Sequence, residues 1–272
     1  MKVAISNIAW GVEEEPAVAA LMQRLVVRGV EVAPGKIGPR PAELGDEEVR
    51  RYRGFWNERG IEIVAMQALL FGTEGLAIFG DERSRRAMSE YLVKIIRLGG
   101  ALGAKALVFG SPKNRLVGTL SQKEVEAIGV PFFRALGAVA AENDTCLCIE
   151  PNPPAYGADW ITTAKEAQAF VALVGQEGFG LHLDAGALHM RGEGAEEIRA
   201  AGSGIRHFHA SQPQLAPLQP GGEVPHERYA EALRGIGYPR WVSVEMRQVG
   251  GQTSSLATVE TALRCAMGTY GG

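Results

Sequence analysis

Two kinds of hydrophobic pattern alternate along the chain. Short continuous runs rich in Val, Ile, Leu and Phe are typical of buried strands. Between them lie longer stretches in which apolar residues recur every three or four positions, as on one face of a helix. The short runs predict strands at Val3–Ala9, Val30–Ala33, Ile61–Met66, Ala106–Phe109, Thr145–Ile149, Gly180–Leu183, Ile205–His209 and Trp241–Val244.

The longer stretches predict the helices. Two of the helix starts carry a capping box, Ser121 with Glu124 and Thr163 with Glu166, in which a hydroxyl and a carboxylate satisfy free amides of the first turn. The predicted helices are Pro16–Arg28, Asp46–Arg59, Asp81–Leu102, Gln122–Glu142, Thr163–Val174, Gly194–Ala201, Pro225–Arg234 and Ser254–Met267.

Strand and helix therefore alternate through the whole chain, without a low-complexity linker or a shift in composition. This order predicts an α/β fold, a single (β/α)8 TIM barrel made by one domain that spans residues 1–272. A doubly wound open sheet is the alternative fold, but it usually has fewer strands and a glycine-rich phosphate loop after the first strand. The sequence has no such loop there, which favours the barrel.

Composition narrows the class of protein. A hydrophobic content of 46% in 272 residues is enough for a large core, and a net charge of -3 argues against a surface that binds nucleic acid. The N-terminus does not resemble a signal peptide, and no apolar run reaches the roughly 18 residues of a membrane span, so we expect a cytoplasmic protein without membrane contact. Cys146 and Cys148 are two apart in one strand and do not predict a disulfide.

Four polar residues stand where predicted strands end in the second half of the chain. They are Glu150, Asp184, His209 and Glu245, and each precedes a segment rich in Gly, Pro or small polar residues. A single acidic residue at a strand end is usually a helix cap or a surface charge. Four on neighbouring strands, at the barrel end where active sites lie, instead predict a site for a divalent metal ion.

Strand periodicity predicts a second layer below these four residues. Side chains two positions upstream face the same way, so Cys148, His182, His207 and Ser243 should point into the barrel. His209 is nearer the mouth than His207 and is the better candidate ligand. The alternate positions of the same four strands should face the helices, and they are Leu147, Ile149, Leu181, Leu183, Phe208, Val242 and Val244.

The phrases IEPNPP, LDAG, HFHAS and SVEM resemble the xylose-isomerase-like barrel superfamily of sugar and sugar-phosphate isomerases and epimerases, and the resemblance covers essentially the whole chain. Successive site residues are separated by 34, 25 and 36 positions, a spacing similar to that of the ketose 3-epimerases. The resemblance implies that Glu150, Asp184, His209 and Glu245 bind Mn²⁺, Mg²⁺, Co²⁺ or a similar ion such as Zn²⁺. It also implies a homodimer or homotetramer with a small carbohydrate substrate.

By the same resemblance, Glu150 and Glu245 transfer protons. This role is chemically reasonable, because removing a proton next to a sugar carbonyl requires a base and a Lewis acid that holds the enediolate oxygens. Two carboxylates on opposite sides of the carbon would then invert its configuration. The sequence thus predicts a metal-dependent isomerase or epimerase of a small sugar or sugar phosphate.

Two positions differ from the ketose epimerases and weaken the case for a free ketohexose. Many relatives have a histidine three residues after the aspartate of the sixth strand, where this chain has Ala187. After the seventh strand the ketose epimerases often have an acidic residue and an arginine, where this chain has Ser211-Gln212-Pro213. A lyase similar to the keto-inositol dehydratases is an alternative. An abasic-site endonuclease needs histidines from the first half of the barrel, and this chain has none before His182. A sugar-binding protein without activity is a further alternative.

Several other residues near strand ends are candidate substrate contacts. Lys36, Lys113 and Arg115 together suggest a site for a phosphate or carboxylate, with solvated loop charges as the alternative. Glu31, inside the second strand, is expected to face inward or to pair with a cation. The candidate substrate residues are Asn7, Trp10, Gln67, Lys113, Asn152, His189 and Arg247.

Overall fold

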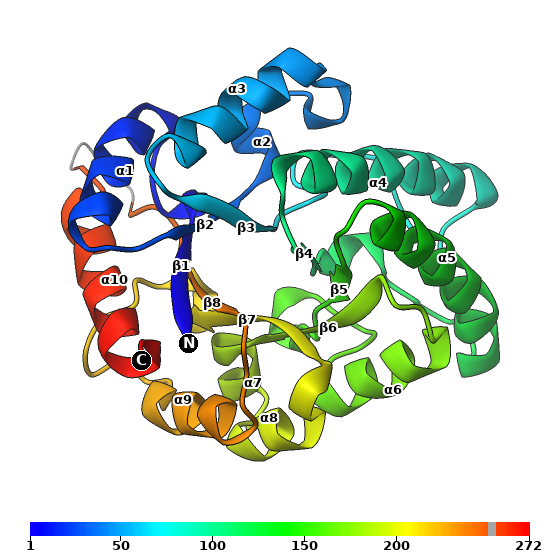
Figure 1. The fold of residues 1–272 in the computed structure, drawn as a ribbon. Coiled ribbons are helices and arrows are strands. Elements are labelled where there is room, and N and C mark those ends of the chain that lie inside the picture. Colours follow the sequence, from blue (N-terminus) through cyan, green and yellow to red (C-terminus); the bar gives the residue numbers. More distant parts are fainter. Residues whose placement is uncertain (250–253) are drawn as a thin grey trace.

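A computed structural model describes residues 1–249 and 254–272 and confirms the (β/α)8 barrel. Each strand pairs in parallel with the next, and the eighth pairs with the first, so the sheet closes on itself. Figure 1 shows the helices arranged around the outside of this ring. The strands are β1 (Lys2–Ser6), β2 (Gly29–Val32), β3 (Glu62–Met66), β4 (Ala106–Phe109), β5 (Leu147–Ile149), β6 (Phe179–Asp184), β7 (Ile205–Ser211) and β8 (Trp241–Glu245).

The helices agree with the periodic stretches of the sequence, and both predicted capping boxes are present. Two short helices, α2 and α7, were not predicted, because a single turn that directly follows a strand has no periodicity to read. The α-helices are α1 (Glu15–Arg24), α2 (Pro34–Ile37), α3 (Asp46–Asn57), α4 (Glu82–Leu102), α5 (Gln122–Glu142), α6 (Ala164–Val174), α7 (Ala185–Met190), α8 (Ala195–Ala201), α9 (His226–Gly235) and α10 (Leu256–Tyr270).

The first strand is shorter than predicted. It ends at Ser6, and the next three residues form a 3-10 turn in which the Ser6 hydroxyl accepts a hydrogen bond from the backbone N–H of Ile8 at 3.4 Å. The apolar run continued to Ala9, so the pattern alone did not reveal the local side-chain cap. Helix α1 likewise stops before its predicted end, since Val26 has a left-handed backbone with φ of 59°.

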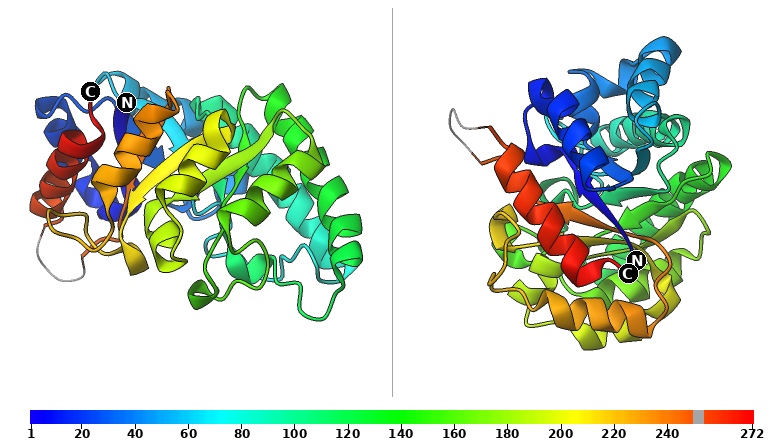
Figure 2. Two further views of the ribbon diagram at one scale, coloured as in Figure 1. Left: turned by 90° about the horizontal axis from the view of Figure 1, so that it is seen from below. Right: turned by 60° about the vertical axis from the view of Figure 1, so that its left-hand side comes forward.

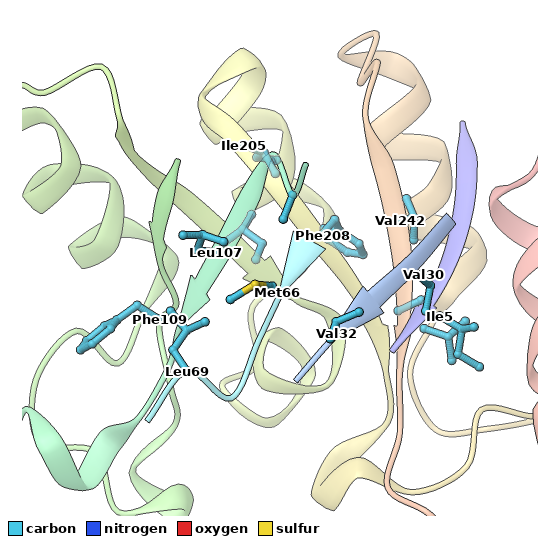
Figure 3. Close-up of a cluster of buried hydrophobic side chains, with 14 of the residues drawn as sticks. Ile5, Val30, Val32, Met66, Leu69, Leu107, Phe109, Ile205, Phe208 and Val242 are labelled. Atoms are coloured by element: carbon cyan, nitrogen blue, oxygen red, sulfur yellow. The ribbon is translucent and has the colours of Figure 1, made fainter. Parts of the chain in front are cut away.

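The core consists of two layers separated by the sheet. The larger layer lies between strands and helices and contains the residues predicted to face outward, as expected for period-two alternation. Figure 3 shows part of it, with Ile5, Val30 and Phe208 among the labelled side chains. The smaller layer fills the barrel interior with small side chains, which are Ala4, Val64, Ala65, Ala106, Cys146 and Cys148.

Phe133 of α5 is the centre of an aromatic cluster between helices α5 and α6 and the sheet. Its ring centroid lies 5.3 Å from that of Phe109, 4.9 Å from that of Phe179 and 5.6 Å from that of Phe170. Edge-on and tilted contacts of this kind add to the hydrophobic stabilisation from burial. The cluster therefore fixes α5 and α6 against β4 and β6.

The two ends of the chain lie next to each other. The amino group of Met1 donates a hydrogen bond to the carbonyl of Gly272 at 2.9 Å, and the two termini lie side by side in Figure 2. Among the described residues, no helix combines the length and hydrophobicity needed to cross a lipid bilayer.

We expect Phe133→Ala to lower the free energy of unfolding by about 3–5 kcal/mol, because it removes a fully buried ring from a close-packed cluster. Urea denaturation followed by tryptophan fluorescence would measure the loss. Phe71→Ala is the matched control, since that ring is 84% exposed and its removal should cost less than about 1 kcal/mol. Equal losses in the two variants would contradict the assignment of Phe133 to the core.

Candidate metal centre

The four residues at the strand ends meet at the carboxyl mouth of the barrel. Glu150 directly follows β5, Asp184 ends β6, His209 lies near the end of β7, and Glu245 ends β8. Asp184 is in register with His209, and Ser211 of β7 is in register with Glu245. The closed parallel sheet thus places residues that are far apart in sequence on one rim.

His209 is central in this group. Its Nδ1 atom lies 3.1 Å from Oε2 of Glu245 and 3.8 Å from Oδ2 of Asp184. One donor atom from each of Glu150, His182, Asp184 and His209 lies within 4.8 Å of the other three. Glu245 is not part of this group of four, but it contacts the group at His209.

His182 is closer to the site than the sequence suggested. Periodicity assigned it to the layer below the mouth, but its Nε2 atom lies 3.6 Å from Oε1 of Glu150 because an imidazole is long enough to reach upward from that layer. The residue is completely buried, and neither ring nitrogen has a hydrogen-bond partner among the described residues. Burial, followed by His209 and His207, holds the pKa of His182 well below its usual value, so the ring is neutral.

Asp184 has two roles. Its Oδ1 atom accepts a hydrogen bond from the backbone N–H of Ala187 at 2.7 Å, which caps the start of α7, and its Oδ2 atom accepts one from the Ser211 hydroxyl. Ser211 also accepts from the backbone N–H of Gly186 at 2.9 Å. A Cβ at Gly186 would lie 2.9 Å from the carbonyl carbon of Gln212, so only glycine allows α7 to approach β7 this closely. The cap holds the carboxylate in a fixed direction.

Glu150 is positioned by its surroundings. A Cβ at Gly110 would lie 2.3 Å from Oε2 of Glu150, so the glycine after β4 leaves the space that the carboxylate occupies. The Arg115 guanidinium is buried beneath the loop and donates to the carbonyls of Glu150 at 2.8 Å, Gly110 at 2.9 Å and Trp160 at 2.9 Å. It also donates to Oδ1 of Asn152 at 2.9 Å. Arg115 therefore ties the ends of β4 and β5 together.

Glu31 supports His209 from inside the barrel. Its carboxylate is completely buried, and its two oxygens lie 3.1 Å and 3.0 Å from Nε2 of His209. Nε2 of His207 lies 3.4 Å from Oε1 of the same carboxylate. Burial by itself would raise the pKa of Glu31, but His209 and His207 outweigh burial and hold it well below the usual value. Glu31 thus faces inward, as expected, and its partners there are the imidazoles of His209 and His207.

The crowded carboxylates raise one another's affinity for protons. Burial, followed by the charges of Glu245 and Asp184, raises the pKa of Glu150 to about 8. Burial and then Glu245 raise the pKa of Asp184 to about 6. Burial opposes the charge on His209, but Glu31 and Glu245 outweigh it and raise the pKa of that imidazole well above 6.5. A group with this much unneutralised negative charge favours a bound cation.

The donor set fits a divalent metal ion. Nδ1 of His209 is buried and has no hydrogen-bond partner of good geometry among the described residues, and Oε2 of Glu245 lies 3.1 Å from it, so a carboxylate oxygen and a ring nitrogen lie close together there. The other nitrogen of the ring is engaged by Glu31, which is the usual arrangement behind a metal-ligating histidine. Carboxylate oxygens with one imidazole suit Mg²⁺, Mn²⁺, Co²⁺ or Zn²⁺.

A cavity of about 460 Å³ opens beside Glu150 and Glu245. Gln67 and Lys36 supply further polar groups to its wall, and Gln67 is held by a hydrogen bond to the Ser6 hydroxyl at 2.8 Å. The volume is suited to a small organic molecule. The apolar part of the wall consists of Ile8, Ala33, Ala68, Phe71, Val108 and Leu215.

Two of the candidate substrate contacts lie inside the protein instead. Trp10 has an exposed fraction of 0% and is not among the residues that line the cavity, so its contact with a substrate stays a prediction. Asn7 is also buried: its Oδ1 accepts from the backbone N–H of Ala33 at 2.8 Å, and its amide donates to the Tyr52 hydroxyl at 3.2 Å. Both residues connect the first loop to the structure around it.

The predicted cluster of three cations does not form. Arg115 is buried and makes the hydrogen bonds described above, Lys36 lines the cavity and donates to the carbonyl of Trp10 at 2.7 Å, and Lys113 is exposed on the loop after β4. Lys113 and Arg247 are not among the residues that line the cavity, and both are exposed.

The two remaining candidates, Asn152 and His189, lie around the site without lining the cavity. Asn152 is buried and paired with Arg115, as described above. His189 is half-buried near the end of α7. Gln67 and Lys36 are the expected contact residues that, within the described part of the chain, lie in the cavity wall.

Comparison with known proteins agrees with this geometry. The model of the family described as xylose isomerase-like TIM barrel matches residues 20–265. The chain belongs to this family. A search of curated proteins with the sequence finds no significant match.

Solved structures of members of this group share the fold over its full length. A D-psicose 3-epimerase in the presence of D-fructose has a TM-score of 0.81 at 19% identity, covering 100% of both chains. The 3-keto-D-glucoside 4-epimerase of E. coli has a TM-score of 0.78 at 15% identity, covering 96% of this chain and 97% of the other. An IolI protein with a bound zinc atom has a TM-score of 0.76 at 16% identity, covering 99% of this chain and 98% of the other.

The metal-free chain should lose stability as the pH rises from about 4.5 to about 8. The pKa of Glu150 is about 8 in the folded chain, above the usual 4.5. The folded state therefore holds this proton more tightly than the unfolded state does. The resulting contribution to the free energy of unfolding is complete below pH 4.5 and is lost as the pH rises through about 8. Urea unfolding across this range should show a smaller loss for Glu150→Gln than for the unmodified chain. Glu231→Gln, on the exposed side of α9, should behave like the unmodified chain. An unchanged slope in Glu150→Gln would contradict the raised pKa.

Proposed function

We propose that the chain is a divalent-metal-dependent isomerase or epimerase of a small sugar or sugar phosphate. The observation that carries the proposal is the convergence of Glu150, Asp184, His209 and Glu245 at the mouth of the barrel, next to a cavity that Glu150 and Glu245 line. This arrangement supports the proposal, because the residues proposed as metal ligands and as proton-transfer groups surround one substrate-sized space.

The structural neighbours support the same class of reaction. Two of them are an epimerase of D-psicose and an epimerase of 3-keto-D-glucosides, and a third neighbour binds zinc. Shared fold alone does not assign chemistry, since many activities occur on this barrel. The donor set of this chain adds the independent support, because it provides oxygens and an imidazole suited to the same kind of ion.

Glu150, Asp184, His209 and Glu245 would hold the metal ion. A bound divalent cation polarises a substrate carbonyl and stabilises negative charge that develops on oxygen. Glu31 keeps the far nitrogen of the His209 ring occupied, so that Nδ1 is presented to the site. Asp184 is held by the backbone N–H of Ala187 and by the Ser211 hydroxyl, which restricts its rotation.

Proton transfer would be divided between Glu150 and Glu245. Glu150 lines the cavity and would serve as the proton donor in one direction of the reaction. Glu245, at the edge of the same cavity, takes the proton from the carbon next to the carbonyl. When Glu150 returns its proton to the opposite face of that carbon, the configuration is inverted and no atom is gained or lost.

The cavity wall supports a small substrate with both polar and apolar sides. Gln67 and Lys36 provide hydrogen-bond donors, and Lys36 supplies the positive charge nearest to a carboxylate or phosphate group of a bound substrate. Phe71, exposed at the mouth, provides a flat face on which the C–H groups of a sugar ring pack.

We expect the protein with Mn²⁺ to catalyse exchange of one carbon-bound hydrogen of a ketose or ketose phosphate with D₂O. Glu150→Gln and Glu245→Gln should each slow this exchange by at least about 100-fold, because each removes a proton-transfer group. Mass and NMR analysis of a substrate panel would measure it, with Glu231→Gln as the control that keeps full activity. Loss of water from the substrate would instead identify a lyase, and full exchange in either glutamine variant would remove that residue from the mechanism.

Glu31→Gln should weaken Mn²⁺ binding by about 10–100-fold, although Glu31 is not a ligand, because the neutral amide holds the His209 ring less firmly. Titration calorimetry on protein freed of metal would give the affinity, and circular dichroism would check that the barrel is intact. Glu231→Gln again provides a carboxylate-to-amide change far from the site. An unchanged affinity in Glu31→Gln would show that the buried carboxylate does not support the metal centre.

A further inference from the structure

A second cavity, also of about 460 Å³, lies at the opposite end of the barrel. Most of its wall is made by residues that precede or begin β1, β4, β5, β6, β7 and β8, which is the amino-terminal rim because all strands are parallel, and Val64 of β3, His207 of β7 and Ala141 of α5 complete it. The metal centre lies at the carboxyl rim, so the two cavities are separated by the filled interior of the barrel.

Four cationic side chains line this second cavity, and they are Lys2, Lys105, Arg206 and Arg240. The acidic residues in the wall are Asp144 and Glu177, and Asp144 is paired with Lys105. Among the described residues, no carboxylate lies within 4.0 Å of a charged nitrogen of Lys2, Arg206 or Arg240. The cavity therefore has an excess of positive charge.

The cations are held in place by contacts other than ion pairs. Arg240 donates to the carbonyl of Ile205 at 3.3 Å, and Nζ of Lys2 lies 5.1 Å from the ring centroid of Trp241. The stem of Arg206 lies across Gly180, where an added Cβ would be 2.4 Å from Cγ of the arginine. The glycine in β6 thus provides the space that brings Arg206 over the rim.

One buried hydroxyl in the wall lacks a hydrogen-bond partner within the described part of the chain, and a buried thiol lies beside one of the arginines. The Thr145 hydroxyl is buried and has no hydrogen-bond partner among the described residues. The Cys146 thiol is also buried, and a Cβ at Gly180 would lie 3.0 Å from its sulfur, so thiol and Arg206 share one corner of the cavity. A hydrogen bond from Cys148, together with the charges of Arg206 and Arg240, lowers the pKa of Cys146, which reflects the positive field.

We infer that this amino-terminal cavity binds a small phosphate-bearing anion. Two guanidinium groups without carboxylate partners match the oxygens of a phosphate or diphosphate, and the lysine charges add long-range attraction. The apolar side of the wall, which includes Trp241, Pro239 and Val64, would pack against the organic part of a phosphate ester. The inference is independent of the proposed isomerase activity.

Isothermal titration of the full-length, metal-free protein with inorganic phosphate, pyrophosphate and adenosine diphosphate would test this inference. We expect pyrophosphate or the nucleotide to bind, and Arg206→Gln and Arg240→Gln each to weaken the affinity at least about tenfold, since each loses a charged hydrogen-bond donor. Tighter binding of adenosine diphosphate would identify an esterified ligand, and tighter binding of pyrophosphate an inorganic one.

Three controls locate the binding. Arg51→Gln makes the same change on the exposed face of α3 and should leave the affinity unchanged. Glu245→Gln alters the metal centre and should also leave it unchanged, which separates this site from the proposed active site. Melting temperatures of the variants would exclude unfolding. Absence of binding by all three anions, or equal binding by the arginine variants, would overturn the inference.

Cysteine alkylation provides a second readout. A bound anion should cover Cys146 and slow its modification by iodoacetamide several-fold, while half-buried Cys265 on α10 serves as the internal reference. Peptide mass spectrometry would report both rates. Slowing of Cys265 to the same extent as Cys146 would show general stabilisation and not occupancy of the cavity, and would count against the inference.

Discussion

The closed ring of eight parallel strands is the constraint on which every other feature depends. A parallel sheet that closes has no free edge, and it places all carboxyl ends on one rim and all amino ends on the other. Glu150 and Glu245, almost a hundred positions apart in sequence, line one cavity for this reason. Small side chains such as those of Ala4 and Ala65 pack together inside the ring.

The barrel holds a buried row of ionisable side chains in contact with one another. Glu31 contacts His209, and His209 contacts Glu245, so carboxylate, imidazole and carboxylate follow one another from the barrel interior to the mouth. Burying any one of these groups alone would cost desolvation free energy, and the contacts between them offset part of that free energy. The charges of Glu150 and Asp184 are less well compensated, since burial and neighbouring carboxylates raise the pKa values of both groups. Stability that is sacrificed at a site in this way is typical of functional groups.

The two rims have opposite electrical character. The carboxyl rim gathers Glu150, Asp184 and Glu245, whereas the amino rim presents Arg206 and Arg240 without carboxylate partners. Both arrangements use glycines at close approaches: Gly110 leaves space for a carboxylate, and Gly180 leaves space for an arginine stem. Acidic and basic side chains are thus concentrated at opposite ends of the barrel.

The sequence by itself determined the order of strands and helices, the barrel, and the four polar residues at the strand ends, because these follow from periodicity and from strand polarity. Only the tertiary structure decided which charges are free. Arg115 and Trp10 looked accessible from the sequence but are buried, and His182 reaches the site from a deeper layer. These outcomes depend on contacts between segments distant in the chain, such as the hydrogen bond from Arg115 to the carbonyl of Trp160, and local patterns contain no information about such contacts.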